Sequence, residues 1–249
     1  MAEERRVLIL AGSAEAVELA RRTAAMAGVA PIASLAGATR APAKLAGELR
    51  VGGFGGAEGL RAFIAERRVA AVIDATHPFA TTISANAVQA CAAAGVARLR
   101  LDRPPWSTRQ GDRWIAVADA RAAAAALPGL GRRIFLAIGR QGLAAVATLG
   151  DLHLLVRVID PPPTPPPANV AFVVGRGPFD VAHERRLFAT HRIDAVVSKN
   201  AGGPASYPKI AAARAAGLPV VMIERPPPPP GPRVATVAEA LAWLAARVG

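Results

Sequence analysis

The run Val69-Ala70-Ala71-Val72-Ile73-Asp74-Ala75-Thr76-His77-Pro78-Phe79-Ala80 carries the clearest structural signal in the chain. Its first five residues are apolar and partly β-branched, which predicts a strand buried on both faces of a parallel sheet. The Ala-rich residues 81–95 predict a helix, and the ring of Pro78 suits its first turn. Polar groups therefore follow the carboxyl end of a parallel strand, where open α/β sheets bind ligands. A capped turn with a hydrogen-bonded histidine is the alternative interpretation.

Strands and helices alternate along the rest of the chain. Short apolar runs predict strands at residues 6–11, 30–35, 48–52, 69–74, 96–101, 113–117, 132–138, 152–159, 170–174, 193–198 and 218–223. Helices are predicted at residues 14–28, 56–67, 81–95, 119–127, 141–148, 179–190, 205–217 and 236–248. This alternation predicts an α/β protein with mainly parallel, doubly wound sheets, and its two halves resemble two copies of one architecture.

A proline-containing stretch, Asp102-Arg103-Pro104-Pro105-Trp106, interrupts the alternation. Two consecutive prolines continue neither a helix nor a central strand, so we place a junction here. The expected division is a first lobe at residues 1–103, a linker at 104–112 and a second lobe at 113–249. Trp106 is compatible with a packing anchor and with the wall of a cleft.

Composition limits the class of protein. The chain has 249 residues, 52% of them hydrophobic and 19% charged, which favours one large or two ordinary folded domains over disorder. The single Cys91 and the absence of zinc-ligand spacing predict a reducing compartment and no metal site. The start lacks a signal-peptide core, and no apolar stretch has the length of a membrane span. We therefore expect a soluble, cytoplasmic protein with no membrane partner.

The charge balance is basic, with 30 Lys and Arg against 18 Asp and Glu and a formal net charge of +12. A basic field concentrates anionic ligands. The arginines are scattered, aromatic residues make up 4% of the chain and no basic helix is visible, so nucleic acid is not the expected partner. An anionic small molecule is compatible with the charge, and so is the compositional bias of a GC-rich genome.

The loop after the first strand contains Gly12, Ser13 and Ala14 at the start of a helix. A glycine and a small hydroxyl residue let a phosphate approach the helix amino end, where N–H groups and the dipole favour anions. The usual Gly-x-Gly-x-x-Gly fingerprint is absent, and a plain turn with Ser13 as the helix cap is equally compatible.

The end of the second strand has no carboxylate, which in a nicotinamide-binding sheet would bind the ribose 2′-hydroxyl. Ser34, Thr39 and Arg40 stand there instead and suit a 2′-phosphate, so a bound dinucleotide would be NADPH in preference to NADH. A solvated basic loop is the alternative. The glycines around Gly53 allow backbone to pass close to a ligand, or form a flexible turn.

Three strand-end loops stand out in the second half: Gly139-Arg140-Gln141, Gly175-Arg176-Gly177-Pro178 and Ser198-Lys199-Asn200-Ala201-Gly202-Gly203. If the sheet is parallel, all three lie on one edge, where their cationic groups suit carboxylates or phosphates. Tyr207 and Lys209 follow. Their separation of two residues does not place them on one helical face, so a short-chain dehydrogenase pair is not predicted.

These residues resemble those of the precorrin-6A reductase family of cobalamin biosynthesis, nearly end to end. The resemblance is carried by Leu10-Ala11-Gly12-Ser13-Ala14-Glu15, Asp74-Ala75-Thr76-His77-Pro78-Phe79-Ala80, Arg103-Pro104-Pro105-Trp106, Gly175-Arg176-Gly177-Pro178-Phe179, Ser198-Lys199-Asn200-Ala201-Gly202-Gly203, Tyr207 and Lys209. It implies an NADPH-dependent reductase that transfers hydride to the macrocycle of precorrin-6A, giving precorrin-6B. It also implies two Rossmann-like lobes with cofactor and substrate in a cleft between them.

A candidate site follows from the loops and the resemblance together. Candidates for handling the proton are His77, Asp74 and Tyr207, with His77 first and water as an alternative. The residues expected at the cofactor are Gly12, Ser13, Ala14, Ser34, Ala36, Thr39, Arg40, Gly53, Ala75, Thr76 and Pro78. Those expected at the carboxylates of the tetrapyrrole are Arg140, Arg176, Lys199, Asn200, Gly202, Gly203 and Lys209. A reductase of another small anionic substrate and a non-catalytic binder of anionic nucleotides remain open.

Overall fold

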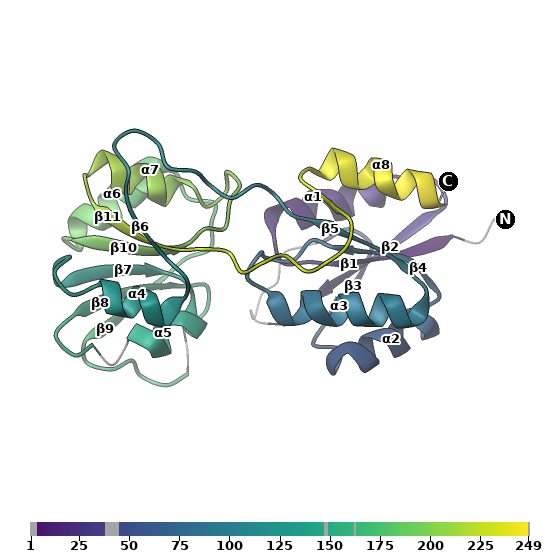
Figure 1. The fold of residues 1–249 in the computed structure, drawn as a ribbon, viewed down its shortest axis with the longest axis horizontal. Coiled ribbons are helices and arrows are strands. Elements are labelled where there is room, and N and C mark those ends of the chain that lie inside the picture. Colours follow the sequence, from purple (N-terminus) through teal and green to yellow (C-terminus); the bar gives the residue numbers. More distant parts are fainter. Residues whose placement is uncertain (1–3, 38–44, 147–148, 162, 249) are drawn as a thin grey trace. The chain divides into compact units, whose positions relative to one another are not determined.

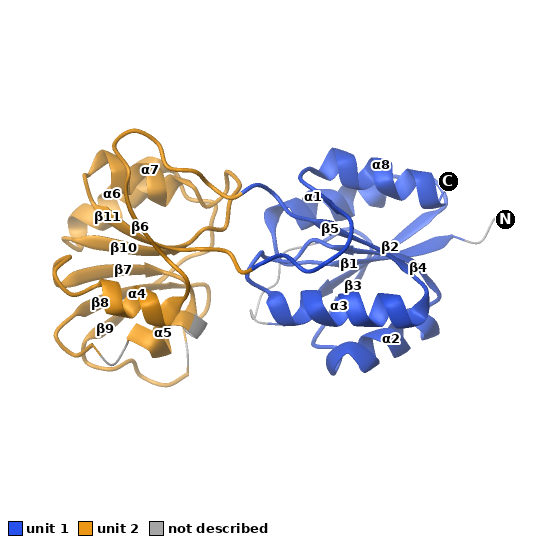
Figure 2. Ribbon diagram, viewed as in Figure 1, with its two compact units in different colours: residues 1–104, 227–249 blue, residues 105–226 orange. Residues whose placement is uncertain are grey.

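The computed structural model describes residues 4–37, 45–146, 149–161 and 163–248. The chain forms two compact units, one of residues 1–104 and 227–249 and one of residues 105–226 (Figure 2). The expected boundary near Pro104 agrees with this division, but the assignment of residues 113–249 to one lobe is wrong at its end. The short strand β12 (Arg233–Val234) pairs with β5 (Ala97–Leu101), so the carboxyl-terminal segment returns to the first unit.

The first unit contains a parallel sheet with strand order β12-β5-β4-β1-β2-β3 over the described residues. Its other strands are β1 (Arg5–Leu10), β2 (Val29–Leu35), β3 (Glu48–Val51) and β4 (Val69–Asp74). Helices α1 (Ala14–Thr23) and α8 (Val237–Val248) cover one face, and α2 (Gly56–Glu66) and α3 (Thr81–Ala94) the other (Figure 1). Strands β1 and β4 are buried on both faces, as their apolar sequences predict.

The second unit repeats this plan with strand order β6-β11-β10-β7-β8-β9, again parallel. Its strands are β6 (Arg113–Val117), β7 (Arg133–Ala137), β8 (His153–Val158), β9 (Val170–Val174), β10 (Ala195–Lys199) and β11 (Pro219–Ile223). Helices α6 (Val181–Thr190) and α7 (Pro208–Ala215) pack on one face, and α4 (Ala120–Ala126) and α5 (Arg140–Val146) on the other (Figure 1).

Several helices are shorter than the sequence pattern predicts. Helix α1 ends at Thr23, and Gly28 lies in a later turn with a φ of 70°, directly before β2. Helix α7 begins at Pro208, which suits a first helical turn because proline lacks the N–H that would be unpaired there. None of the helices in the described part of the chain combines the length and the apolar character needed to cross a membrane.

Each sheet has one point where the direction of winding reverses. In the first sheet this point lies between β1 and β4, and in the second between β7 and β10. The loops that leave such a pair of strands diverge to opposite faces of the sheet, which opens a crevice at the carboxyl edge. These two switch points are therefore the places where the fold itself positions a ligand site.

Candidate functional site

At the first switch point, the turn after β1 touches the turn after β4. A Cβ atom added to Gly12 would lie 3.4 Å from the backbone nitrogen of His77, which is an ordinary van der Waals contact and shows that the two turns are neighbours. The Ser13 hydroxyl donates to the Ala75 carbonyl at 2.9 Å and accepts from the Ala16 N–H at 3.2 Å, which caps helix α1. The structure thus brings together five residues predicted at the cofactor: Gly12, Ser13, Ala14, Ala75 and Thr76.

Asp74 is completely buried beneath this crevice. One carboxylate oxygen accepts from the Thr76 hydroxyl at 2.6 Å and the Thr76 N–H at 3.2 Å, and the other from Arg100 at 2.6 Å. Arg100 also donates to the Ser84 hydroxyl of α3 at 2.6 Å. These contacts do not fit the predicted catalytic contact for Asp74, because a fully enclosed, ion-paired carboxylate meets no substrate. It fastens the turn that carries His77.

Arg100 and Ser84 were not found by sequence reasoning. The available signal was the pattern Ala97-Arg98-Leu99-Arg100-Leu101, in which arginines alternate with leucines in a strand. A charged residue on the inward face of a strand requires a buried partner, and Asp74 on the neighbouring strand β4 is the partner of Arg100.

His77 lies at the switch point with a partly exposed side chain. Its Nδ1 atom accepts a hydrogen bond from the Phe79 N–H at 3.3 Å, and the two rings lie 5.7 Å apart. Since Nδ1 is an acceptor, the proton of the neutral imidazole resides on Nε2. The Pro78 side chain is buried. The parts of this turn that are left to face a ligand are therefore its backbone and the His77 ring.

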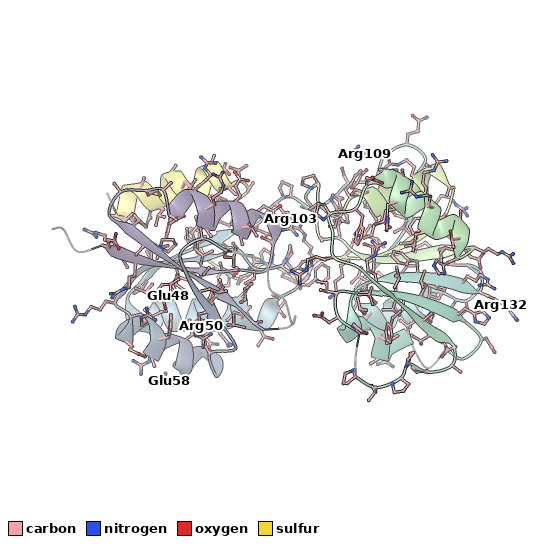
Figure 3. All side chains as sticks on the ribbon, turned by 180° about the vertical axis from the view of Figure 1, so that it is seen from behind. Glu48, Arg50, Glu58, Arg103, Arg109 and Arg132 are labelled. Atoms are coloured by element: carbon pink, nitrogen blue, oxygen red, sulfur yellow. The ribbon has the colours of Figure 1, made fainter. Side chains whose placement is uncertain are left out.

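Glu15 stands in the first turn of α1, where a negative charge would oppose a bound phosphate. Arg103 pairs with it at 2.8 Å, and both side chains are largely buried (Figure 3 labels Arg103). The pair cancels the carboxylate charge close to the helix amino end. Arg103 is thus a third residue whose contribution sequence reasoning missed.

The end of β2 bears on the choice of nucleotide. Ser34 is 5% exposed, and its carbonyl accepts from the Ala11 N–H at 2.8 Å, so it belongs to the sheet more than to the surface. Ala36 and Gly53 are exposed at the carboxyl edge. The predicted contacts Thr39 and Arg40 lie outside the described residues. No acidic side chain occurs in the described segment 29–37, which fits a nucleotide with a 2′-phosphate.

In the second unit, the loop after β10 is held rigidly. The Asn200 side chain accepts from the Trp106 N–H at 2.8 Å and donates to the Trp106 carbonyl at 3.0 Å. The Trp106 indole N–H donates to Gly203 at 2.8 Å, so Trp106 is a packing anchor. Arg225 donates to the carbonyls of Asn200 and Ala201 at 2.8 Å each. Asn200 therefore shapes the loop, which is a different task from the substrate contact predicted for it.

The two glycines of this loop are required by the backbone. Gly202 has a φ of 65° and Gly203 a φ of 72°, both in the left-handed region that side chains disfavour. Their predicted place at the substrate is untested, but their conformation explains why the loop contains them.

Lys209 is 6% exposed, and its ammonium group donates to the Ser206 carbonyl at 2.6 Å. Burial lowers the pKa of Lys209 to about 8; Glu184 acts in the opposite direction and Arg157 adds to the decrease. Arg157 and Glu184 form two hydrogen bonds of 2.6 and 2.9 Å. This buried charged cluster was missed in the sequence, although an arginine inside the apolar strand β8 marks it. It does not fit a direct substrate contact by Lys209.

Tyr207 lies against the linker after the first unit. Its hydroxyl accepts a hydrogen bond from Arg214, and its ring makes an edge contact with Trp106 at 5.6 Å. Arg214 in turn pairs with Asp112 at 2.8 Å. Tyr207 remains partly exposed, and its phenolic proton is still able to be donated to a neighbour.

The three basic loops of the second unit do lie on one edge, because all paired strands are parallel. Burial lowers the pKa of Lys199, which is half-buried at the end of β10. Arg176 is exposed after β9, three strands from β10, which corresponds to roughly 14 Å across the sheet. Arg140 begins α5, but its side chain is outside the described part of the structure.

Two cavities of the second unit lie at the opposite, amino-terminal edge of its sheet. One of about 190 Å³ is lined by residues that include Arg133 and His153 at the starts of β7 and β8. Another of about 380 Å³ includes Arg113 and Pro219, which begin β6 and β11. Neither contains a residue predicted for ligand binding, so they do not form the candidate site.

The fold and the first switch point define a two-unit α/β protein with a glycine and a helix amino end at the carboxyl edge of its first sheet. These are the features of a dinucleotide-binding sheet. The chain matches the family described as precorrin-6x reductase CbiJ/CobK over residues 6–245. It belongs to this family and is an oxidoreductase.

Relatives agree with this assignment over nearly their whole length. A precorrin-6A reductase of Rhodococcus erythropolis is 48% identical over 240 residues, covering 96% of this chain and 97% of the relative. A precorrin-6A reductase of Rhodobacter capsulatus is 45% identical over 241 residues, with 96% of each chain covered. The solved structure of CobK precorrin-6A reductase superimposes with a TM-score of 0.93 at 44% identity, covering 98% of this chain and 97% of that one.

Proposed function

We propose that this chain is an NADPH-dependent precorrin-6A reductase, which reduces the macrocycle of precorrin-6A to precorrin-6B (dihydro-precorrin-6A) in cobalamin biosynthesis. The observation that carries the proposal is the family match over residues 6–245, which includes both units. The metal-free substrate is proposed because relatives at 45% and 48% identity bear that name.

The first unit suits the cofactor. Gly12 and the amino end of α1 offer backbone N–H groups to a pyrophosphate, and Arg103 removes the opposing charge of Glu15. The described end of β2 lacks the acid that would select NADH. NADPH, when bound, supplies the hydride. The chain's task is then to orient the nicotinamide and exclude water, which is chiefly a matter of proximity.

The second unit suits a polycarboxylate. Lys199 and Arg176 stand at the carboxyl edge of its sheet, and the loop from Lys199 to α7 is fixed by Arg225 and Asn200. A tetrapyrrole that carries acetate and propionate groups matches a basic, preorganised edge. That cofactor and substrate meet in a cleft between the two units stays a prediction.

A proton must accompany the hydride, because reduction of a carbon–carbon double bond adds both. We assign its delivery first to the imidazolium form of His77, which donates the proton from Nε2 and is left as the neutral ring. Nδ1 is protonated in that form, so it accepts from the Phe79 N–H only in the neutral, Nε2-protonated ring. Tyr207 and a water molecule are the alternatives. Asp74 acts through His77 as a positioning residue, since its carboxylate is enclosed by Thr76 and Arg100.

The test is oxidation of NADPH followed at the nicotinamide absorbance in the presence of precorrin-6A, with mass spectrometry of the product. We expect a product heavier by two hydrogen atoms and a lower KM for NADPH than for NADH. Absence of turnover with precorrin-6A, together with turnover of another anionic substrate, would refute the proposed substrate and keep the oxidoreductase assignment. Equal use of NADH would refute the proposed cofactor.

A further inference from the structure

Arg50 lies beside the carboxyl end of β2, although it belongs to β3. In the parallel pairing Ser34 is opposite Arg50, and the Gly52 N–H donates to the Leu35 carbonyl at 2.8 Å. In sheets that bind dinucleotides, the residues around this end of the second strand meet the adenosine ribose. Arg50 is thus an arginine at the place where the 2′-substituent of a nucleotide is read.

The guanidinium of Arg50 is held in position before any ligand arrives. It donates to the carbonyls of Gly52 and Gly53, the latter at 2.8 Å. Its central carbon, Cζ, lies 3.8 Å from the centre of the Phe54 ring and 5.3 Å from that of Phe63. Because Gly52 and Gly53 follow the strand, these contacts draw the charged group to the carboxyl edge of the sheet, where Gly53 is exposed.

Arg50 has carbonyl and ring partners but no carboxylate partner among the described residues. The two acids closest along β3 and at the start of α2 are paired elsewhere: Glu48 with Arg67 and Glu58 with Arg61 (Figure 3 labels Glu48, Arg50 and Glu58). A guanidinium has five N–H donors, and the two glycine carbonyls use two of them. The group therefore keeps its positive charge and donor capacity for an anion.

We infer that Arg50 binds the 2′-phosphate of NADPH and sets the preference for NADPH over NADH. The inference rests on the proposed function, since it presumes that a nicotinamide nucleotide occupies the first unit. A guanidinium fixed in a plane recognises a phosphate with paired N–H donors, which an ammonium group does not reproduce. The preference then comes from a residue of β3, in addition to the segment after β2 on which the sequence prediction relied.

The test measures binding by calorimetry for adenosine 2′,5′-bisphosphate, 5′-AMP, NADPH and NADH. Arg50→Met keeps apolar contact with Phe54 and removes the charge. We expect the affinities for NADPH and the bisphosphate to fall by about tenfold to a hundredfold, as for the loss of a charged hydrogen-bond pair. The affinities for NADH and AMP should stay within about twofold of the wild type. Arg50→Lys should restore part of the difference. Arg61→Met, which removes an exposed arginine already paired with Glu58, is the matched control and should change none of the four binding affinities.

Equal weakening of NADPH and NADH by Arg50→Met would overturn the inference, because Arg50 would then support the loop or the adenine. An unchanged ratio of the two affinities would also overturn it. If Arg50→Met does not fold, Arg50→Lys provides the test. An Arg50→Lys protein with the wild-type ratio of affinities for the bisphosphate and AMP would also contradict the inference. A wild-type protein that binds the bisphosphate no better than AMP would contradict the NADPH proposal itself, which separates the two failures.

Discussion

The two units share one architecture but differ in how they treat charge at their switch points. In the first, the charged residues below the crevice form complete pairs, Asp74 with Arg100 and Glu15 with Arg103. In the second, Glu184 stands against two cations, Arg157 and Lys209, and the loop above carries Lys199. The switch point of the first unit therefore offers neutral surroundings with backbone donors, and that of the second an excess of positive charge.

Under the proposed function, this difference lets one fold serve two ligands. A pyrophosphate is bound by N–H groups and a helix amino end, and needs nearby acids to be neutralised. A substrate with many carboxylates is attracted by a surplus of cations on a rigid edge. The architecture supplies the edge in both units, whereas the buried partners of each arginine determine the charge that the edge presents.

The largest effect is expected from breaking the buried ion pairs. Asp74→Asn leaves Arg100 enclosed without its counter-ion and should cost about 3–5 kcal/mol of stability, confined to the first unit. Glu184→Gln should do the same in the second, where Arg157 and Lys209 would face each other. Hydrogen exchange of each unit, together with urea unfolding, measures this. Asp119→Ala, an exposed helix cap of α4, is the control at about 1 kcal/mol. A stable Asp74→Asn protein with abolished turnover would instead restore Asp74 as a catalytic residue.

A smaller effect concerns pH and the surplus charge of the second unit. Burial lowers the pKa of Lys209 from 10.5 in the unfolded chain to about 8. Between these values the unfolded chain holds the proton and the folded chain has released it, so stability should rise with pH by about 1.4 kcal/mol per unit. Below about pH 8 the contribution of Lys209 to stability no longer changes with pH.

Lys209→Met should lack that rise, so the difference in unfolding free energy between wild type and variant should change between pH 7 and 10 in favour of the wild type. Chemical denaturation at a series of pH values checks this, and ionisations common to both proteins cancel. If the difference in unfolding free energy does not change with pH, Lys209 has its ordinary pKa and burial does not destabilise its charged form.

Gly12→Val tests the first switch point. The added Cβ would have ordinary contacts with the turn at His77, and NADPH affinity should fall about tenfold because the side chain shields the backbone from the nucleotide. Fluorescence titration with NADPH measures it. Gly150→Ala, with open space around it, is the control in the second unit. Unchanged NADPH affinity in Gly12→Val would place the nucleotide elsewhere.

The smallest effect is expected from Glu15→Gln. It removes an acid near the amino end of α1 and leaves Arg103 uncompensated, which should strengthen NADPH binding about twofold to threefold. The helix should lose at most about 1 kcal/mol, since a charge in its first turn contributes little more. Weaker binding, measured by the same titration at low salt, would mean that the pair organises the site instead of neutralising it.

Much of the fold could be predicted because local patterns act over short distances. Buried parallel strands require continuous apolar runs, as residues 69–73 show, and prolines at 104 and 105 end the first stretch of alternation. The strand β12 was missed because Arg233 and Val234 are too few to show a period. Its pairing with β5 depends on chain segments more than 130 residues apart, so no local pattern announces that the last helix returns to the first unit.

The candidate site was predictable in position but not in the task of each residue. Parallel strands determine that Gly12, His77, Lys199 and Arg176 lie on carboxyl edges, and an alternating sequence is enough to establish that. Which polar side chains face a ligand depends on their partners. Asp74, Asn200 and Lys209 look like ligand-binding groups in the sequence, yet Arg100, Trp106 and the Ser206 carbonyl occupy them.

The sequence by itself determined the α/β class, the two parallel sheets, the loops at their carboxyl edges and the family, because these follow from apolar periodicity and short motifs. The tertiary structure alone decided which charges are neutralised, which loops are fixed and to which unit the final helix belongs. The reason is that a buried charge requires a partner within hydrogen-bond distance, and such partners come from strands and helices distant in the chain.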